Sequence, residues 1–222
     1  MCELRESDVL VDLCTQRDYL ANGSGWKVAH ADQVLANIKH LMGWARWARL
    51  PVISSVDERR PEEAVAGERP PCVLGTPGQK KVSYSLMPDR VMVESDNCLC
   101  ISLDILEHHQ QAILSKQHRD PLTNPKLDRL LTEMPAKRFV VFGVSTDSCI
   151  RSLVLGLLLR ERDVVVVTDA CGYWNDAEAD FCQRQVTAKG CPLVSTNTYI
   201  GQCAARSDLW RKPHLNQKRF VA

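Results

Sequence analysis

No stretch of the sequence is apolar for long enough to cross a lipid bilayer. The longest apolar runs, Leu153–Leu159 and Val164–Val167, are separated by four charged residues, and each is far shorter than the roughly 20 residues that a membrane-spanning helix needs. Residues 1–12 mix acidic and basic side chains before any apolar run, unlike a secretory signal segment. We therefore expect a cytoplasmic protein without a membrane partner.

The chain also has almost no net charge. Its 28 Lys and Arg residues nearly balance 27 Asp and Glu residues, so no overall field attracts a nucleic-acid backbone or an anionic membrane. We expect a small-molecule partner and no nucleic acid.

No composition shift marks a linker in the 222 residues, which favours a single domain over residues 1–222 with a core at about 8–196. We interpret the basic C-terminal tail, residues 206–222, as an arm or a subunit contact.

Metal-ligand patterns are missing as well. Ten cysteines are present, but the only close pair is Cys98 and Cys100, and neither a CxxC pair nor a histidine cluster supplies the ligands of a structural zinc site. A reducing compartment disfavours a disulfide framework, so most of the cysteines are expected to be small buried side chains. The sequence predicts no metal and no cofactor.

Short apolar runs alternate with segments of helical spacing along the chain. Such alternation is typical of a parallel sheet covered by helices on both faces, and we predict a three-layer α/β fold. The expected helices are Ala31–Leu50, Cys149–Leu159 and Ala177–Lys189; the expected strands are Asp8–Asp12, Pro51–Val56, Ala112–Lys116, Phe139–Phe142, Val164–Val167 and Pro192–Val194.

Ligands bind beyond the carboxyl ends of the strands in such sheets, which draws attention to Cys149. A strand is expected to end at Gly143 and a helix to begin near Asp147 or Ser148, so Cys149 would lie in the first helical turn. Unpaired N–H groups there favour a thiolate and can hold an oxyanion. The ordinary alternative is a buried, inert cysteine.

Two ionisable residues also follow predicted strands. Asp12 ends the first strand and Lys116 ends the run that begins at Ala112. Each alone is compatible with a capping or solvated side chain. Together with Cys149 they would supply a base and a cation for a thiol that must attack a carbonyl at neutral pH.

Four motifs resemble those of the isochorismatase-like cysteine hydrolases, over about Val9 to Thr196. They are Val11-Asp12 with Thr15–Tyr19 downstream, Lys116 with Asn124–Leu127, Gly143–Cys149, and Val167–Ala170. The resemblance implies a six-stranded parallel sheet and a catalytic triad of Asp12, Lys116 and Cys149. It also implies dimers or tetramers.

The same resemblance assigns further roles at the site. It implies a cis peptide before Ser145 and an oxyanion hole formed by the backbone N–H groups of Ser145 and Cys149. Tyr19, Thr146 and Tyr173 are then expected to contact the substrate.

The chain departs from the family pattern in two places. Gln16 and Tyr19 lie two positions further from Asp12 than the commonest family spacing. Asp57-Glu-Arg-Arg60 also replaces the Asp-x-His metal motif of the nicotinamidases.

The resulting hypothesis is a cysteine hydrolase that cleaves an amide-type C–N bond through a thioester and releases ammonia or an amine. Asp12 would act as base, Lys116 would stabilise the charged pair, and no cofactor would be needed. Two alternatives stay open. One is a catalytically silent binding or scaffold protein, and the other is a thiol redox protein with Cys14 or Cys171 as the resolving cysteine.

Overall fold

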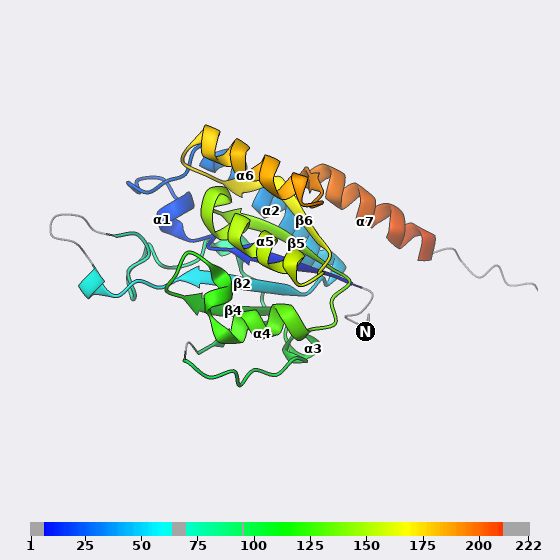
Figure 1. Cartoon of the computed structure of the whole chain (residues 1–222), viewed down its shortest axis with the longest axis horizontal. Coiled ribbons are helices and arrows are strands. Elements are labelled where there is room, and N and C mark those ends of the chain that lie inside the picture. The colour runs from blue at the N-terminus through cyan, green and yellow to red at the C-terminus, as the bar shows by residue number, and fades with distance from the viewer. Residues whose placement is uncertain (1–6, 64–69, 95, 211–222) are drawn as a thin grey trace, which may run out of the picture.

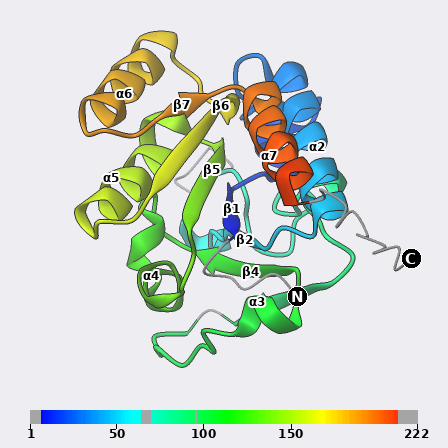
Figure 2. The ribbon, with the colours of Figure 1, turned by 90° about the vertical axis from the view of Figure 1, so that its right-hand side faces the viewer.

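A computed structural model describes residues 7–63, 70–94 and 96–210. A parallel sheet forms the middle layer, and helices cover both of its faces (Figure 1). Figure 2 shows α2 (Ala31–Ala48) and α7 (Thr196–Trp210) on one side of the sheet, with α4 (Pro125–Glu133), α5 (Arg151–Leu159) and α6 (Asp176–Ala188) on the other. The predicted three-layer α/β class is confirmed.

The sheet has seven strands in the order β3-β4-β2-β1-β5-β6-β7, and each neighbouring pair is parallel. The strands are β1 (Asp8–Leu13), β2 (Val52–Asp57), β3 (Arg90–Val93), β4 (Gln111–Lys116), β5 (Arg138–Val144), β6 (Val164–Gly172) and β7 (Leu193–Val194).

The expected number of six strands was wrong, because β3 was not recognised. This strand has four residues and alternates between exposed and half-buried side chains, and Met92 is 63% exposed. It lies at the edge of the sheet and pairs only with β4. A short edge strand with little burial lacks the continuous apolar pattern that revealed the other six.

The remaining helical elements are shorter. They are α1 (Arg17–Leu20), α3 (Ile105–His108), the 3₁₀ turns η2 (Pro61–Glu63), η3 (Ser83–Ser85) and η4 (Pro121–Thr123), and the π-helical turn η5 (Thr146–Ile150). The helix expected at Ala31–Leu50 is confirmed as α2, whose apolar stripe, with Ile38 and Leu41 fully buried, packs on the sheet. No helix among the described residues is both long and apolar enough to span a membrane. Of the basic tail, residues 211–222 lie outside the described part.

The centre of the sheet places the ends of β1 and β5 side by side. On one side of β1 lie β2, β4 and β3. On the other side lie β5, β6 and β7, so the strand order reverses between β1 and β5. Leu13 is the register partner of Gly143, and a Cβ on Gly143 would lie 2.0 Å from the Leu13 carbonyl oxygen. Only glycine permits this close approach, which occurs at the position where parallel α/β sheets bind ligands.

Candidate active site

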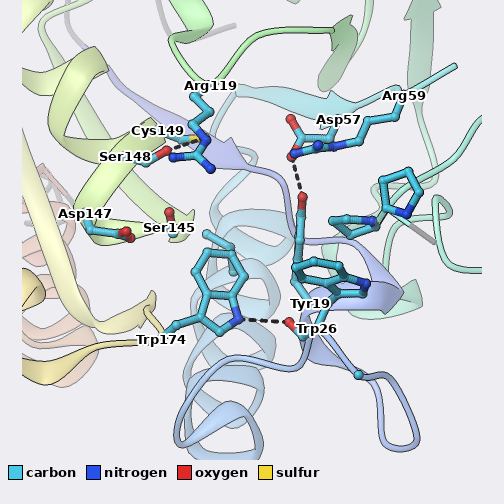
Figure 3. Close-up of a pocket in the computed structure, with 14 residues that line it drawn as sticks. Tyr19, Trp26, Asp57, Arg59, Arg119, Ser145, Asp147, Ser148, Cys149 and Trp174 are labelled. Carbon is cyan, nitrogen blue, oxygen red and sulfur yellow. Dashed lines mark hydrogen bonds between the residues drawn. The ribbon is translucent and has the colours of Figure 1, made fainter. Parts of the chain in front are cut away.

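Cys149 lies in η5, between β5 and α5, and lines a cavity of about 540 Å³. The predicted position in the first helical turn after the strand is confirmed, although this turn is π-helical. The Val144–Ser145 peptide is cis, as the resemblance implies. The cavity is also lined by Tyr19, Trp26, Asp57, Arg59, Arg119, Ser145, Asp147, Ser148 and Trp174 (Figure 3).

Lys116 places its ammonium group beside the thiol of Cys149. Its Nζ lies 3.4 Å from Cys149 Sγ and donates to the His118 carbonyl oxygen at 3.0 Å. The side chain is almost completely buried, and its ion-pair partner is Asp57. Lys116 and Asp57 are register partners at the ends of β4 and β2, so strand pairing places this ion pair beside the cavity.

The carboxylate of Asp57 is held from several directions. The Tyr19 hydroxyl donates to it at 2.7 Å (Figure 3), and Lys116 donates to the other oxygen. The Gln16 side chain fixes the backbone of the same residue, accepting from the Asp57 N–H at 2.7 Å and donating to its carbonyl oxygen at 2.8 Å. A carboxylate fixed in this way can orient Lys116 toward the thiol.

Cys14 follows β1 and lies behind Cys149, away from the cavity. Its φ of 50° is in the left-handed region, where a non-glycine residue is uncommon, and it turns the chain at the end of the strand. The thiol is fully buried, 3.7 Å from the Ser55 hydroxyl, and hydrogen-bonded to Cys149. The site therefore contains two neighbouring thiols that affect each other's acidity.

The two thiols have opposite acidities. The hydrogen bond from Cys14, with the Lys116 charge, lowers the pKa of Cys149 to about 6 although burial raises it. Burial, with the hydrogen bond donated to Cys149, raises the pKa of Cys14 well above its ordinary value. Burial lowers the pKa of Lys116, but the two neighbouring thiols and Asp57 outweigh it and raise that pKa. At neutral pH these shifts give a Cys149 thiolate beside a Lys116 ammonium and a neutral Cys14 thiol.

The structure does not bring Asp12 to this site. The Asp12 side chain is fully buried, 2.8 Å from Lys81 Nζ, and accepts from the Ser54 hydroxyl at 3.0 Å. Ser54 and Ser55 are successive residues of β2 and point to opposite faces of the sheet, so Asp12 and Cys14 lie on different faces. The carboxylate that influences Cys149 and Lys116 is that of Asp57, in place of the Asp12 base that the sequence suggested.

Of the three residues predicted to contact the substrate, one lines the cavity and two do not. Tyr19 lines the cavity and meets the ring of Trp174 edge-on, with the ring centres 5.6 Å apart. Thr146 is buried and donates to the Gly172 carbonyl oxygen, and Tyr173 packs near His30, so neither belongs to the cavity lining. Trp174, next to Tyr173, lines the cavity instead.

The donor set at the cavity does not suit a divalent metal ion. Among the described residues, no three His, Cys, Asp or Glu side chains gather as ligands would. Asp57 already accepts from Lys116 and Tyr19, and Arg59 follows it where the family motif has a histidine. A cation bound there would have to displace the Lys116 ammonium from its partner.

The family follows from comparison with known proteins. A family model, the isochorismatase domain, matches residues 8–198, and the chain therefore belongs to the isochorismatase family. At the level of the family this confirms the predicted class, hydrolases that act on carbon–nitrogen bonds other than peptide bonds, and it leaves the substrate open. No curated protein sequence matches the chain.

Solved structures share the fold. The nicotinamidase/pyrazinamidase PncA of Bacillus subtilis has 15% identity and a TM-score of 0.67, covering 85% of this chain and 100% of its own. The zinc complex of Pyrococcus horikoshii pyrazinamidase has 18% identity and a TM-score of 0.65, with 85% and 99% covered. MAR1 ribonuclease of Caenorhabditis elegans has 15% identity and a TM-score of 0.61, with 97% and 96% covered.

Sequence reasoning missed Asp57, and the departure in spacing explains why Asp12 was chosen. The family's usual spacing, counted back from Gln16 and Tyr19, leads to Cys14 and not to Asp12. A cysteine in that position offered no carboxylate to recognise. Asp57 directly follows the predicted strand Pro51–Val56 and was considered as part of a missing metal motif, although the carboxyl end of a buried parallel strand is where functional side chains gather.

Proposed function

We propose that the protein is a cysteine hydrolase that cleaves an amide-type C–N bond of a small molecule, with Cys149 as the nucleophile. The observation that carries the proposal is the state of this thiol. It lines the cavity, it lies 3.4 Å from the Lys116 ammonium, and its pKa is lowered to about 6. A thiolate present at neutral pH can attack a carbonyl without a separate base.

In the first step, the Cys149 thiolate attacks the carbonyl carbon of the amide. The backbone N–H groups of Ser145 and Cys149 are the proposed oxyanion donors, since Ser145 is the N-cap of η5 and Cys149 lies within its single turn, and N–H groups of a first turn have no carbonyl partner inside the helix. As the C–N bond breaks, the leaving nitrogen takes a proton from Lys116. The products are a thioester on Cys149 and ammonia or an amine.

Lys116 recovers this proton in the second step. Acylation removes the thiolate charge that helps to raise the Lys116 pKa, so the lysine becomes more acidic when its proton is needed. Water then attacks the thioester and gives a proton to the neutral amine of Lys116, and the thiolate is expelled. Asp57 acts as a positioning residue that keeps Lys116 beside the sulfur through both steps.

The cavity walls favour a small, flat substrate that carries an anionic group. Tyr19, Trp26 and Trp174 supply aromatic surface, and the Trp174 indole N–H donates to the Trp26 carbonyl oxygen at 3.0 Å (Figure 3). Arg59 and Arg119 also line the cavity, and a guanidinium group binds a carboxylate in a two-point contact.

The test is a panel of small amides with and without a carboxylate, scored by release of ammonia or amine. We expect turnover by the wild type and none above background by Cys149→Ala. Turnover that persists in Cys149→Ala would contradict the proposal. If no amide reacts although several bind, the alternative of a silent binding protein is favoured. Dimer or tetramer assembly, a cytoplasmic location and the absence of a nucleic-acid partner stay predictions.

A further inference from the structure

The site contains a second thiol, Cys14, whose sulfur forms no bond in the proposed hydrolysis. Cys14 and Cys149 follow β1 and β5, the adjacent central strands between which the strand order reverses. The register pairing of Leu13 with Gly143 brings the ends of these strands together, and the Cys14 and Cys149 side chains interact closely enough to shift each other's pKa.

The two thiols differ in their access to reagents. Cys149 lines the cavity, whereas Cys14 is fully buried behind it, beside the Ser55 hydroxyl. A small oxidant that enters the cavity therefore meets Cys149 first. Cys14 can reach only what is already attached to the sulfur of Cys149. This order of access is the arrangement of an attacking thiol and a resolving thiol.

We propose that Cys14 and Cys149 form a reversible disulfide when a peroxide enters the cavity, so that Cys14 protects the nucleophile from irreversible oxidation. The lowered pKa of Cys149 supports the order of events, because a thiolate reacts with peroxides and a thiol does not. The buried Cys14 keeps its proton until the sulfur beside it becomes electrophilic.

Hydrogen peroxide is the oxidant in this scheme. The Cys149 thiolate attacks one peroxide oxygen, an S–O bond forms as the O–O bond breaks, and the departing hydroxide takes a proton from solvent. The sulfur of Cys149 is thereby oxidised by two electrons to a sulfenic acid. Cys14 then attacks this sulfur, the S–S bond forms, and the hydroxide that leaves takes the Cys14 proton. In total, two thiols and one peroxide give one disulfide and two water molecules.

Cys171, the other resolving cysteine considered from the sequence, is engaged elsewhere. Its thiol donates to the Val167 carbonyl oxygen at 3.1 Å within β6. Burial raises the pKa of Cys171, and Cys149 is not among the groups that shift it. Cys171 therefore provides a matched control, because it is a buried cysteine of the same sheet without the contact to Cys149.

The experiment treats the full-length protein with a small excess of hydrogen peroxide, alkylates the remaining thiols, and maps tryptic peptides by mass. Cys14 lies in the tryptic peptide of residues 6–17 and Cys149 in that of residues 139–151, and neither contains another cysteine. We expect these two peptides to be joined by a disulfide that dithiothreitol reverses. A sulfinic or sulfonic acid at Cys149 without the joined peptides, a Cys149 disulfide to another cysteine, or two unreacted thiols would each overturn the proposal.

Cys14→Ser separates protection from thiolate stabilisation, because serine still offers a hydroxyl donor but cannot form the disulfide. In this variant we expect the fraction of Cys149 recovered by dithiothreitol to fall at least about fivefold relative to the wild type, as oxidation proceeds past the sulfenic acid. Cys171→Ser should recover like the wild type. Equal recovery in Cys14→Ser and the wild type would contradict the protective role.

Formation of the disulfide does not depend on the proposed function. The expectation that the disulfide also stops hydrolysis does rest on the proposed function. A protein that forms the disulfide and hydrolyses no amide would contradict the hydrolase alone. A protein that hydrolyses amides and never forms the disulfide would contradict the redox proposal alone.

Discussion

Two buried lysine–aspartate pairs lie near the carboxyl ends of the central strands, and they have different surroundings. Lys81 and Asp12 form the first, 2.8 Å apart, with side-chain exposures of 3% and 0%. Lys116 and Asp57 form the second, with exposures of 1% and 14%. The first pair is enclosed by Ser54 and Thr15, whereas the second contacts the thiol of Cys149 and the cavity.

The comparison shows that a buried charge does not by itself identify an active site. Both pairs carry the cost of desolvating two charges, which mutual attraction and hydrogen bonds must offset. Asp12 uses that attraction to tie β1 to the chain at Lys81, and so holds together two segments that are distant in sequence. Lys116 uses its charge to stabilise a thiolate.

The largest expected effect is on kcat, and it should distinguish Lys116 from Lys81. Lys116→Met removes the cation next to Cys149 and should reduce kcat for a responsive amide by roughly 10³-fold, since proton transfer and charge stabilisation are both lost. The matched variant Lys81→Met should lose stability in thermal unfolding and keep the kcat of its folded fraction. Similar losses of kcat in both variants would remove the distinction between the pairs.

The two aspartates of these pairs, Asp57 and Asp12, should also differ in their effect on kcat. Asp57→Asn should lower kcat by about 100-fold, because Lys116 loses its orientation. Alkylation of Cys149 should not slow, because the negative charge of Asp57 raises the Cys149 pKa, and the bond to the His118 carbonyl oxygen keeps the Lys116 charge near the sulfur. Slower alkylation in Asp57→Asn would show that Asp57 has another role.

Asp12→Asn is the control for Asp57→Asn. Leaving the buried Lys81 without a carboxylate should cost roughly 3–5 kcal/mol of stability, measured by denaturant unfolding. The kcat of the folded fraction should stay within about twofold of the wild type. A large loss of kcat without a loss of stability would restore Asp12 to the catalytic role that the sequence suggested.

A smaller loss of kcat should follow when a hydrogen bond that supports the Lys116–Asp57 pair is removed. Tyr19→Phe removes one hydrogen bond to Asp57 and should lower kcat about fivefold, in line with the usual free energy of such a bond. Steady-state kinetics on the same amide measures this change in kcat. An unchanged kcat would show that Lys116 and Gln16 suffice to hold Asp57 in place.

The smallest effect concerns binding alone. Arg119 is exposed and lines the cavity, so Arg119→Ala should raise KM several-fold for an amide that carries a carboxylate and leave kcat nearly unchanged. A neutral amide of similar size provides the comparison. An equal change in KM for both substrates would remove the case for anion recognition.

Local pattern was enough to predict the fold class and the position of Cys149. The short apolar runs predicted six of the seven strands, and the Gly143–Cys149 segment predicted the turn after β5. Lys116 was also placed correctly at the end of β4, beside the thiol. These features depend on residues that are close together in the sequence.

The partners of these residues could not be predicted in the same way. Lys81 and Asp57 meet their partners through strand pairing and a long loop, so spacing along the chain carries no signal for either contact. The left-handed backbone at Cys14 is adopted by a residue type that seldom takes it, and this turn decides which side chain after β1 faces Cys149.

The most direct test of the account is the rate of alkylation of Cys149 as a function of pH, read from the tryptic peptide of residues 139–151. Because the lowered pKa favours the thiolate, the rate should be constant above about pH 7 and fall as the pH drops through about 6. Asp12→Asn should show the same midpoint, and Lys116→Met a higher one. A midpoint near the ordinary thiol pKa in the wild type, or a midpoint that moves with Asp12 and not with Lys116, would contradict the account.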